Sequence, residues 1–135
     1  MSVGILIISH DGIGPALLGT ATLMLNDCPL PTKLLTASRD CEPEQLAEDA
    51  IELIGALDTD EGVLVLTDLY GSTPSNIAQK LTSQKHVHVV SGLNLSMLIR
   101  VFNYPQLTLE ELSEKAVSGG KDGILKIVSE TNHGQ

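Results

Sequence analysis

The stretch that decides the fold of this 135-residue chain is VGILIISHDGIGP, residues 3–15. Its first six residues are continuously apolar, which is typical of a strand buried on both faces of a parallel sheet. One serine separates this run from His10, and a glycine-rich turn follows. Because ligands and catalytic groups collect at the carboxyl ends of parallel strands, His10 is the first candidate for chemistry.

Strands and helices alternate along the rest of the chain. β-like apolar runs predict strands at residues 3–9, 32–37, 62–67 and 86–90. Helical spacing predicts helices at residues 16–25, 46–57, 74–81, 95–101 and 108–117, the last opened by a capping box and ended by two glycines. The pattern predicts one three-layer α/β domain over residues 1–135, with a mainly parallel four-stranded sheet in the order 2-1-3-4.

The last apolar run, residues 124–128, stands apart from this alternation. It follows the final predicted helix after a glycine-containing break, and only a polar tail comes after it. We therefore expect a short strand that pairs antiparallel at a sheet edge, either of its own sheet or of a neighbouring subunit.

The composition is that of an ordinary globular domain. Hydrophobic residues make up 42% and charged residues 19% of the chain, and the formal net charge is −9. This charge opposes binding to nucleic acid, and an aromatic content of 2% leaves few rings on which bases could stack. Cys28 and Cys41 form no CxxC pair, which indicates reduced thiols and a cytoplasmic protein. No apolar run approaches the ~20 residues of a membrane span.

A second strand end offers a carboxylate near His10. Asp68 directly follows the run at residues 62–67, and a loop containing Gly71, Ser72 and Thr73 comes after it. If the two strands are neighbours, the carboxylate fixes the tautomer of His10 and leaves its other ring nitrogen free to attack. The loop adds hydroxyls and helix-start N–H groups that suit an anion. This favours a phosphoryl group on His10, with a structural histidine and an aspartate that caps its own turn as the alternatives.

Other polar residues give weaker signals. His86 and His88 alternate on the fourth predicted strand, without cysteines or suitably spaced carboxylates, so we interpret them as exposed residues and expect neither a metal nor a cofactor. Arg39 follows the second strand and is the cation best placed to reach the crevice, although a surface salt bridge is the preferred interpretation. The chain has no Gly-x-Ser-x-Gly elbow, Walker loop or Gly-x-Gly-x-x-Gly fingerprint, so neither a serine hydrolase nor a nucleotide site is indicated.

Three segments spread over most of the chain carry a family resemblance. They are VGILIISHDGIGPALLGTATLML near the start, GVLVLTDLYGSTPSNIAQKL in the middle and SGLNLSMLIR after the fourth strand. Their content and spacing resemble the enzyme IIA domains of the mannose family of the bacterial phosphoenolpyruvate-dependent sugar phosphotransferase system. Tyr70 stands where that family commonly has tryptophan, and Ser96 where it often has proline.

The resemblance implies a phosphoryl-transfer protein that needs no metal. His10 would accept phosphate from the phosphocarrier protein HPr and pass it to a histidine of a IIB partner, with Asp68 orienting the ring. The phosphoryl-binding loop would be formed by Gly71, Ser72 and Thr73, and the rim by Tyr70, Asn76, Gly92 and Asn94. The family forms homodimers that exchange the final strand, which would account for residues 124–128. Contact with a membrane would come only through a IIC/IID transporter.

Other functions stay open beside this one. Within the phosphotransferase system, the role could be regulatory rather than in sugar transport. The phosphotransfer subunit of dihydroxyacetone kinase shares the fold and the early histidine, but its usual Met-Gly-Ser loop lacks the counterparts of Pro74 and Asn76. From a different class, a non-catalytic regulatory module would use the same crevice to bind a partner.

Overall fold

The four strands form one parallel sheet in the order β2-β1-β3-β4, as the alternating pattern predicts. The computed structural model describes residues 2–57, 60–84 and 86–129. Along the chain, the elements are β1 (Gly4–His10), α1 (Ile13–Leu25), β2 (Thr32–Ala37), α2 (Pro43–Ala56), β3 (Val63–Thr67), α3 (Thr73–Leu81), β4 (Val87–Ser91), α4 (Leu95–Phe102) and α5 (Leu109–Asp122). None of these helices is both long and apolar enough to cross a membrane.

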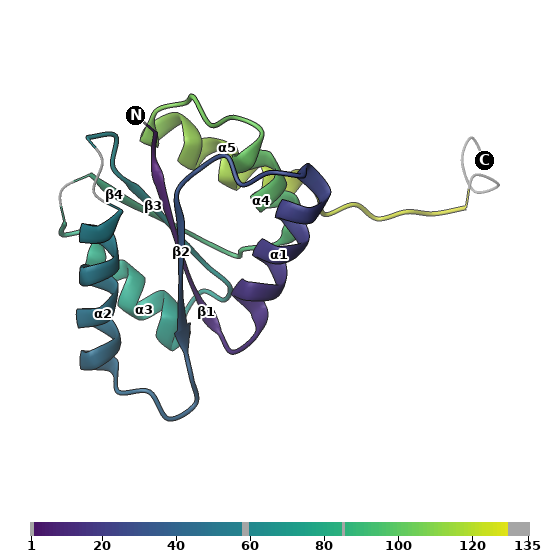
Figure 1. The fold of residues 1–135 in the computed structure, drawn as a ribbon. Coiled ribbons are helices and arrows are strands. Elements are labelled where there is room, and N and C mark those ends of the chain that lie inside the picture. Colours follow the sequence, from purple (N-terminus) through teal and green to yellow (C-terminus); the bar gives the residue numbers. More distant parts are fainter. Residues whose placement is uncertain (1, 58–59, 85, 130–135) are drawn as a thin grey trace.

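Helices cover both faces of the sheet. Figure 1 shows α2 and α3 on one face and α1, α4 and α5 on the other. On β1, Ile5 and Ile7 pack into the core beside α1, α4 and α5, whereas Leu6 and Ile8 pack into the core beside α2 and α3. The continuous apolar run of this strand is therefore explained by burial on both faces.

Two glycines that predict the end of the last helix lie inside it. Helix α5 begins at the expected capping box, formed by Thr108 and Glu111, but it continues to Asp122. A Cβ at Gly119 would lie 2.4 Å from the Cβ of Arg100 on α4. The prediction of a helix end at Gly119 and Gly120 is thus wrong, because the glycines allow α4 and α5 to approach each other closely.

The C-terminal apolar run forms no strand within the described residues. After α5, residues 123–129 leave the body of the molecule as an extended segment (Figure 1). Ile124, Leu125 and Ile127 are 76%, 75% and 89% exposed. The expected pairing with the chain's own sheet is wrong, because the segment does not turn back along an edge strand. Pairing with a neighbouring subunit stays a prediction.

Candidate functional site

The sheet brings His10 and Asp68 together across two neighbouring strands. His10 ends β1, and Asp68 directly follows β3. The Asp68 Oδ2 atom accepts two hydrogen bonds from His10, one from the backbone N–H at 3.1 Å and one from ring Nδ1 at 2.9 Å. The side chain of Asp68 is 6% exposed and that of His10 is 45% exposed. A buried carboxylate therefore holds the ring of a histidine that is open to solvent.

This geometry determines which ring nitrogen of His10 is free. A carboxylate only accepts hydrogen bonds, so the proton of the neutral ring lies on Nδ1 and the lone pair on Nε2. Any bond formed by Nε2 places positive charge on the ring, and the carboxylate of Asp68 stabilises that charge. This arrangement leaves Nε2 as the ring nitrogen that is able to act as a nucleophile.

Ser9 and two glycines shape the turn that follows His10. The Ser9 hydroxyl donates to the carbonyl of His10 at 2.9 Å and accepts the backbone N–H of Gly14 at 2.8 Å. A Cβ at Gly14 would lie 2.7 Å from that hydroxyl oxygen, and Gly12 has a left-handed φ of 79°. The buried serine therefore ties the start of α1 to the end of β1, which fixes the backbone on both sides of His10.

The loop between β3 and α3 brings one of the three predicted phosphoryl-binding residues into the His10 pocket. Thr73 is the first residue of α3 and lines the same pocket as His10. The hydroxyl of Ser72 donates to the carbonyl of Leu69, inside the loop itself. Gly71 has a φ of 86°, and its N–H donates to Ser75 at 3.3 Å. These two residues shape the loop.

A pocket of about 440 Å³ opens beside His10 at the carboxyl ends of β1 and β2. Its walls come from the ends of both strands, from the start of α2 and from the start of α3; the lining residues are His10, Asp11, Ala37, Ser38, Arg39, Cys41, Pro43, Thr73 and Pro74. The β2–α2 loop thus contributes more of the site than its sequence indicated. The strand order was the signal for this contribution, because it makes β2 a neighbour of β1. In the structure, Ala37, the last residue of β2, is in register with His10.

The four predicted rim residues lie outside this set of lining residues, all within the described part of the chain. Tyr70 is 72% exposed in the loop before α3, and Asn76 is exposed on α3 itself. Gly92 follows β4 with a φ of 84°. Asn94 caps α4 by accepting the N–H of Met97 at 2.8 Å and also donates to the carbonyl of residue 120 at 3.3 Å. Asn94 therefore has a structural role here, joining α4 to α5.

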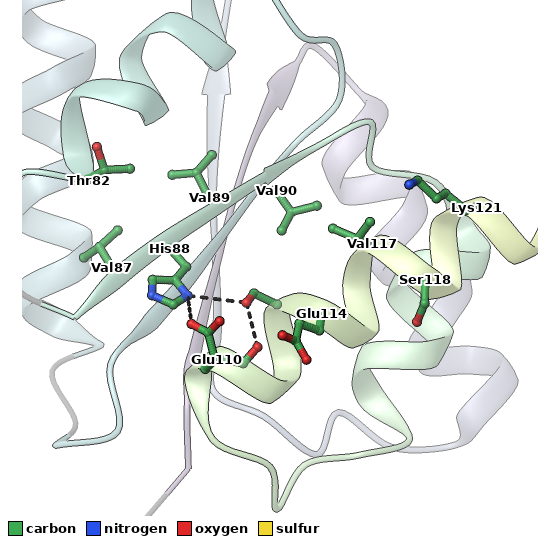
Figure 2. Close-up of a pocket in the computed structure, with 11 residues that line it drawn as sticks. Thr82, Val87, His88, Val89, Val90, Glu110, Glu114, Val117, Ser118 and Lys121 are labelled. Carbon is green, nitrogen blue, oxygen red and sulfur yellow. Dashed lines mark hydrogen bonds and ion pairs between the residues drawn. The ribbon is translucent and has the colours of Figure 1, made fainter.

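The two histidines near β4 lie in different surroundings. Strand β4 begins at Val87, so His86 precedes it, with a φ of 60°, instead of starting it as expected. Nδ1 of His88 lies 3.4 Å from the hydroxyl of Ser113 and 3.8 Å from a carboxylate oxygen of Glu110 (Figure 2). No group of three potential metal ligands occurs among the residues that the structure describes.

The fold and the site together define a class of protein: a parallel α/β domain with a carboxylate-oriented histidine at the carboxyl edge of its sheet. A family model described as "PTS system fructose IIA component", where PTS is the phosphotransferase system, matches residues 4–117. The chain therefore belongs to this enzyme IIA family of the mannose type, and the resemblance of its three segments is confirmed.

Individual relatives agree with this assignment. The chain is 31% identical over 131 residues to the PTS system mannose-specific EIIAB component of Escherichia coli K12, a match that covers 92% of the chain. It spans only 39% of the length of that curated relative.

Solved structures show the same fold. The mannose/sorbose specific IIA subunit from Enterococcus faecalis superposes with a TM-score of 0.85 at 21% identity, covering 96% of this chain and 97% of that one. The EIIA component from Streptococcus agalactiae gives a TM-score of 0.78 at 25% identity, covering 92% and 96%.

Proposed function

We propose that this protein is a phosphoryl carrier of the sugar phosphotransferase system, and that its phosphoryl group is held on Nε2 of His10. The donor is phospho-HPr and the acceptor is a histidine of a IIB protein or domain. The observation that carries the proposal is the 2.9 Å contact between Asp68 Oδ2 and His10 Nδ1, which leaves Nε2 with its lone pair. Membership of the enzyme IIA family supports the same role.

The only bonds that change in the transfer step are those between phosphorus and the two histidine nitrogens. The Nε2 lone pair of His10 attacks phosphorus while the phosphorus–nitrogen bond to the donor histidine breaks, and its electron pair returns to the donor ring. The His10 ring then keeps its Nδ1 proton and becomes cationic, and the carboxylate of Asp68 balances that charge. Transfer to IIB repeats these events in the opposite direction. Since the bonds broken and formed are alike, catalysis here consists mainly of positioning.

The test is phosphorylation of the purified protein with phosphoenolpyruvate, enzyme I and HPr. We expect an acid-labile phosphate on the wild-type protein and none on His10→Gln. A matched control is His88→Gln. This variant removes a partly exposed histidine on β4, the edge strand that is not in contact with β1. An unlabelled wild-type protein would refute the relay and favour a non-catalytic binding module. Full labelling of His10→Gln would refute the relay through His10, because another residue would then carry the phosphate. Labelling without transfer to any IIB would favour a regulatory role.

We also propose that the chain forms a homodimer through residues 124–128. These residues expose their apolar side chains, and the edge strand β4 pairs only with β3 in the described part of the chain. A groove of about 680 Å³ runs between β4 and α5, with Val90 and Val117 among its apolar walls and Glu110 and Glu114 at its side (Figure 2). The charged side chains that line the groove are two acids and Lys121, and Lys126 is the one charged residue of the apolar segment. The segment of a second copy therefore matches the groove in hydrophobicity, and its charge is opposite to that of the two acids.

Sedimentation equilibrium tests the dimer. The wild-type protein should have twice the mass of one chain, and the double variant Leu125→Asp/Ile127→Asp should have the mass of a monomer. Leu23→Asp is the matched control, because Leu23 is 81% exposed on α1. A monomeric wild-type protein, or a double variant that is still dimeric, would exclude this interface.

A further inference from the structure

Arg39 lines the pocket of His10 and has no partner among the residues that the structure describes. It lies two residues beyond Ala37, the β2 residue in register with His10, and it lines the 440 Å³ pocket. No ion pair or hydrogen bond joins Arg39 to any residue in the ranges that the structure describes. The expected surface salt bridge is therefore absent there, whereas Arg100 has such a partner, Asp122, at 3.3 Å.

The charges around the pocket explain why a positive charge matters at this position. Asp68 is held against the ring of His10, and Asp11 lines the same pocket. Both carboxylates repel an incoming phosphoryl dianion, in a chain whose formal net charge is −9. Thr73 offers a hydroxyl, which is neutral. Among the lining residues, all of them described, Arg39 is the one that always carries a positive charge.

We propose that the guanidinium of Arg39 binds the oxygens of the phosphoryl group on His10 Nε2. This inference rests on the proposed function and assigns a further residue to the same site. A planar guanidinium donates two parallel hydrogen bonds to a phosphoryl group, so it supplies geometry as well as charge. Arg39 offsets the repulsion from the two carboxylates and aligns the phosphoryl group with Nε2, while Asp68 stabilises the ring.

The experiment compares Arg39→Gln and Arg39→Lys with the wild-type protein, using two phosphoryl donors. Phosphoramidate is a small donor without a protein surface; its phosphorus–nitrogen bond breaks, and ammonia leaves as the bond to Nε2 forms. Phospho-HPr is the protein donor. Lys33→Gln is the matched control, because it removes an exposed cation of β2 that does not line the pocket. Thermal unfolding checks that the variants fold.

With both phosphoryl donors, we expect Arg39→Gln to be phosphorylated at least about tenfold more slowly than the wild-type protein. The reason is that the transferred group loses one charged hydrogen-bonding partner at a solvent-accessible position. Arg39→Lys should recover only part of the rate, and the defect should shrink in high salt. The ³¹P resonance of the phosphorylated protein should also shift in Arg39→Gln, because the phosphoryl oxygens lose a direct contact. Lys33→Gln should match the wild-type protein.

Two results would overturn the assignment while leaving the phosphoryl relay intact. In the first, Arg39→Gln is phosphorylated at the wild-type rate by both donors. In the second, the defect is limited to phospho-HPr and appears as a higher KM with an unchanged ³¹P resonance, which would make Arg39 a docking contact for the partner. Failure of the wild-type protein to accept phosphate from either donor would instead refute the relay itself, and this inference with it.

Discussion

Replacement of Asp68 by asparagine isolates the charge of the carboxylate from its shape. Asparagine can still accept both hydrogen bonds of His10 through its oxygen, but it cannot balance a cationic ring. With 2.9 Å between Oδ2 and Nδ1, Coulomb's law gives roughly 1.5–6 kcal/mol for effective dielectric constants of about 80 to 20. Because His10 is 45% exposed and Asp68 only 6%, we take an intermediate loss of about 3 kcal/mol. The rate of phosphorylation should then fall on the order of 100-fold.

The assay is single-turnover phosphorylation by phospho-HPr, followed by rapid quenching at high pH. Asp122→Asn is the matched control, since it neutralises an exposed carboxylate that pairs with Arg100 at 3.3 Å, and it should react at the wild-type rate. In Asp68→Asn, the new amide nitrogen takes the place of Asp68 Oδ1, a buried oxygen that has no hydrogen-bond partner among the described residues. The variant therefore buries an amide nitrogen without a partner, which can lower its stability. Urea unfolding measures this loss of stability separately from the loss of charge stabilisation at His10. A folded Asp68→Asn protein that reacts within threefold of wild type would refute the electrostatic reasoning.

Further predictions concern the stability of the helices, measured by urea unfolding. Gly119→Ala should destabilise the protein by about 1–3 kcal/mol, because its Cβ would lie 2.4 Å from the Cβ of Arg100. Gly19→Ala should instead stabilise it by roughly 0.5–1 kcal/mol, since the Cβ added within α1 would have no atom within 4 Å apart from its chain neighbours and the backbone of its own helix. Equal effects at the two glycines would contradict the close approach of α4 and α5. Thr108→Ala should cost about 1 kcal/mol through loss of the α5 cap, and Thr108→Ser much less. Equal losses for these two Thr108 variants would show that the hydroxyl does not stabilise the helix.

The contact between His10 and Asp68 was within reach of sequence reasoning, although 58 residues separate them. Both follow continuously apolar runs, and such runs are typical of parallel strands buried on two faces. Only a few strand orders are available to a parallel sheet of this size, and the order 2-1-3-4 makes β1 and β3 neighbours. Hydrophobic periodicity and topology together thus place the two side chains at one edge.

The interactions of Arg39 could not be predicted from the sequence. Its position after β2 was visible in the sequence, but the expected surface salt bridge does not form among the described residues. The path of the β2–α2 loop depends on how α2 and α3 pack beside it, and a loop has no periodicity from which that path can be calculated. The same limit applies to Cys41, which reaches the pocket through the same loop.

Local sequence by itself determined the elements of this protein: the apolar runs that become strands, the capping box that opens α5, and the order in which strands and helices alternate. Tertiary structure alone decided what was ambiguous locally. Two glycines fit a helix end as well as a helix interior, and only the approach of α4 shows that Gly119 and Gly120 lie inside α5. The physical reason is range, because propensity and periodicity act over a few residues, whereas close packing joins segments that are distant along the chain.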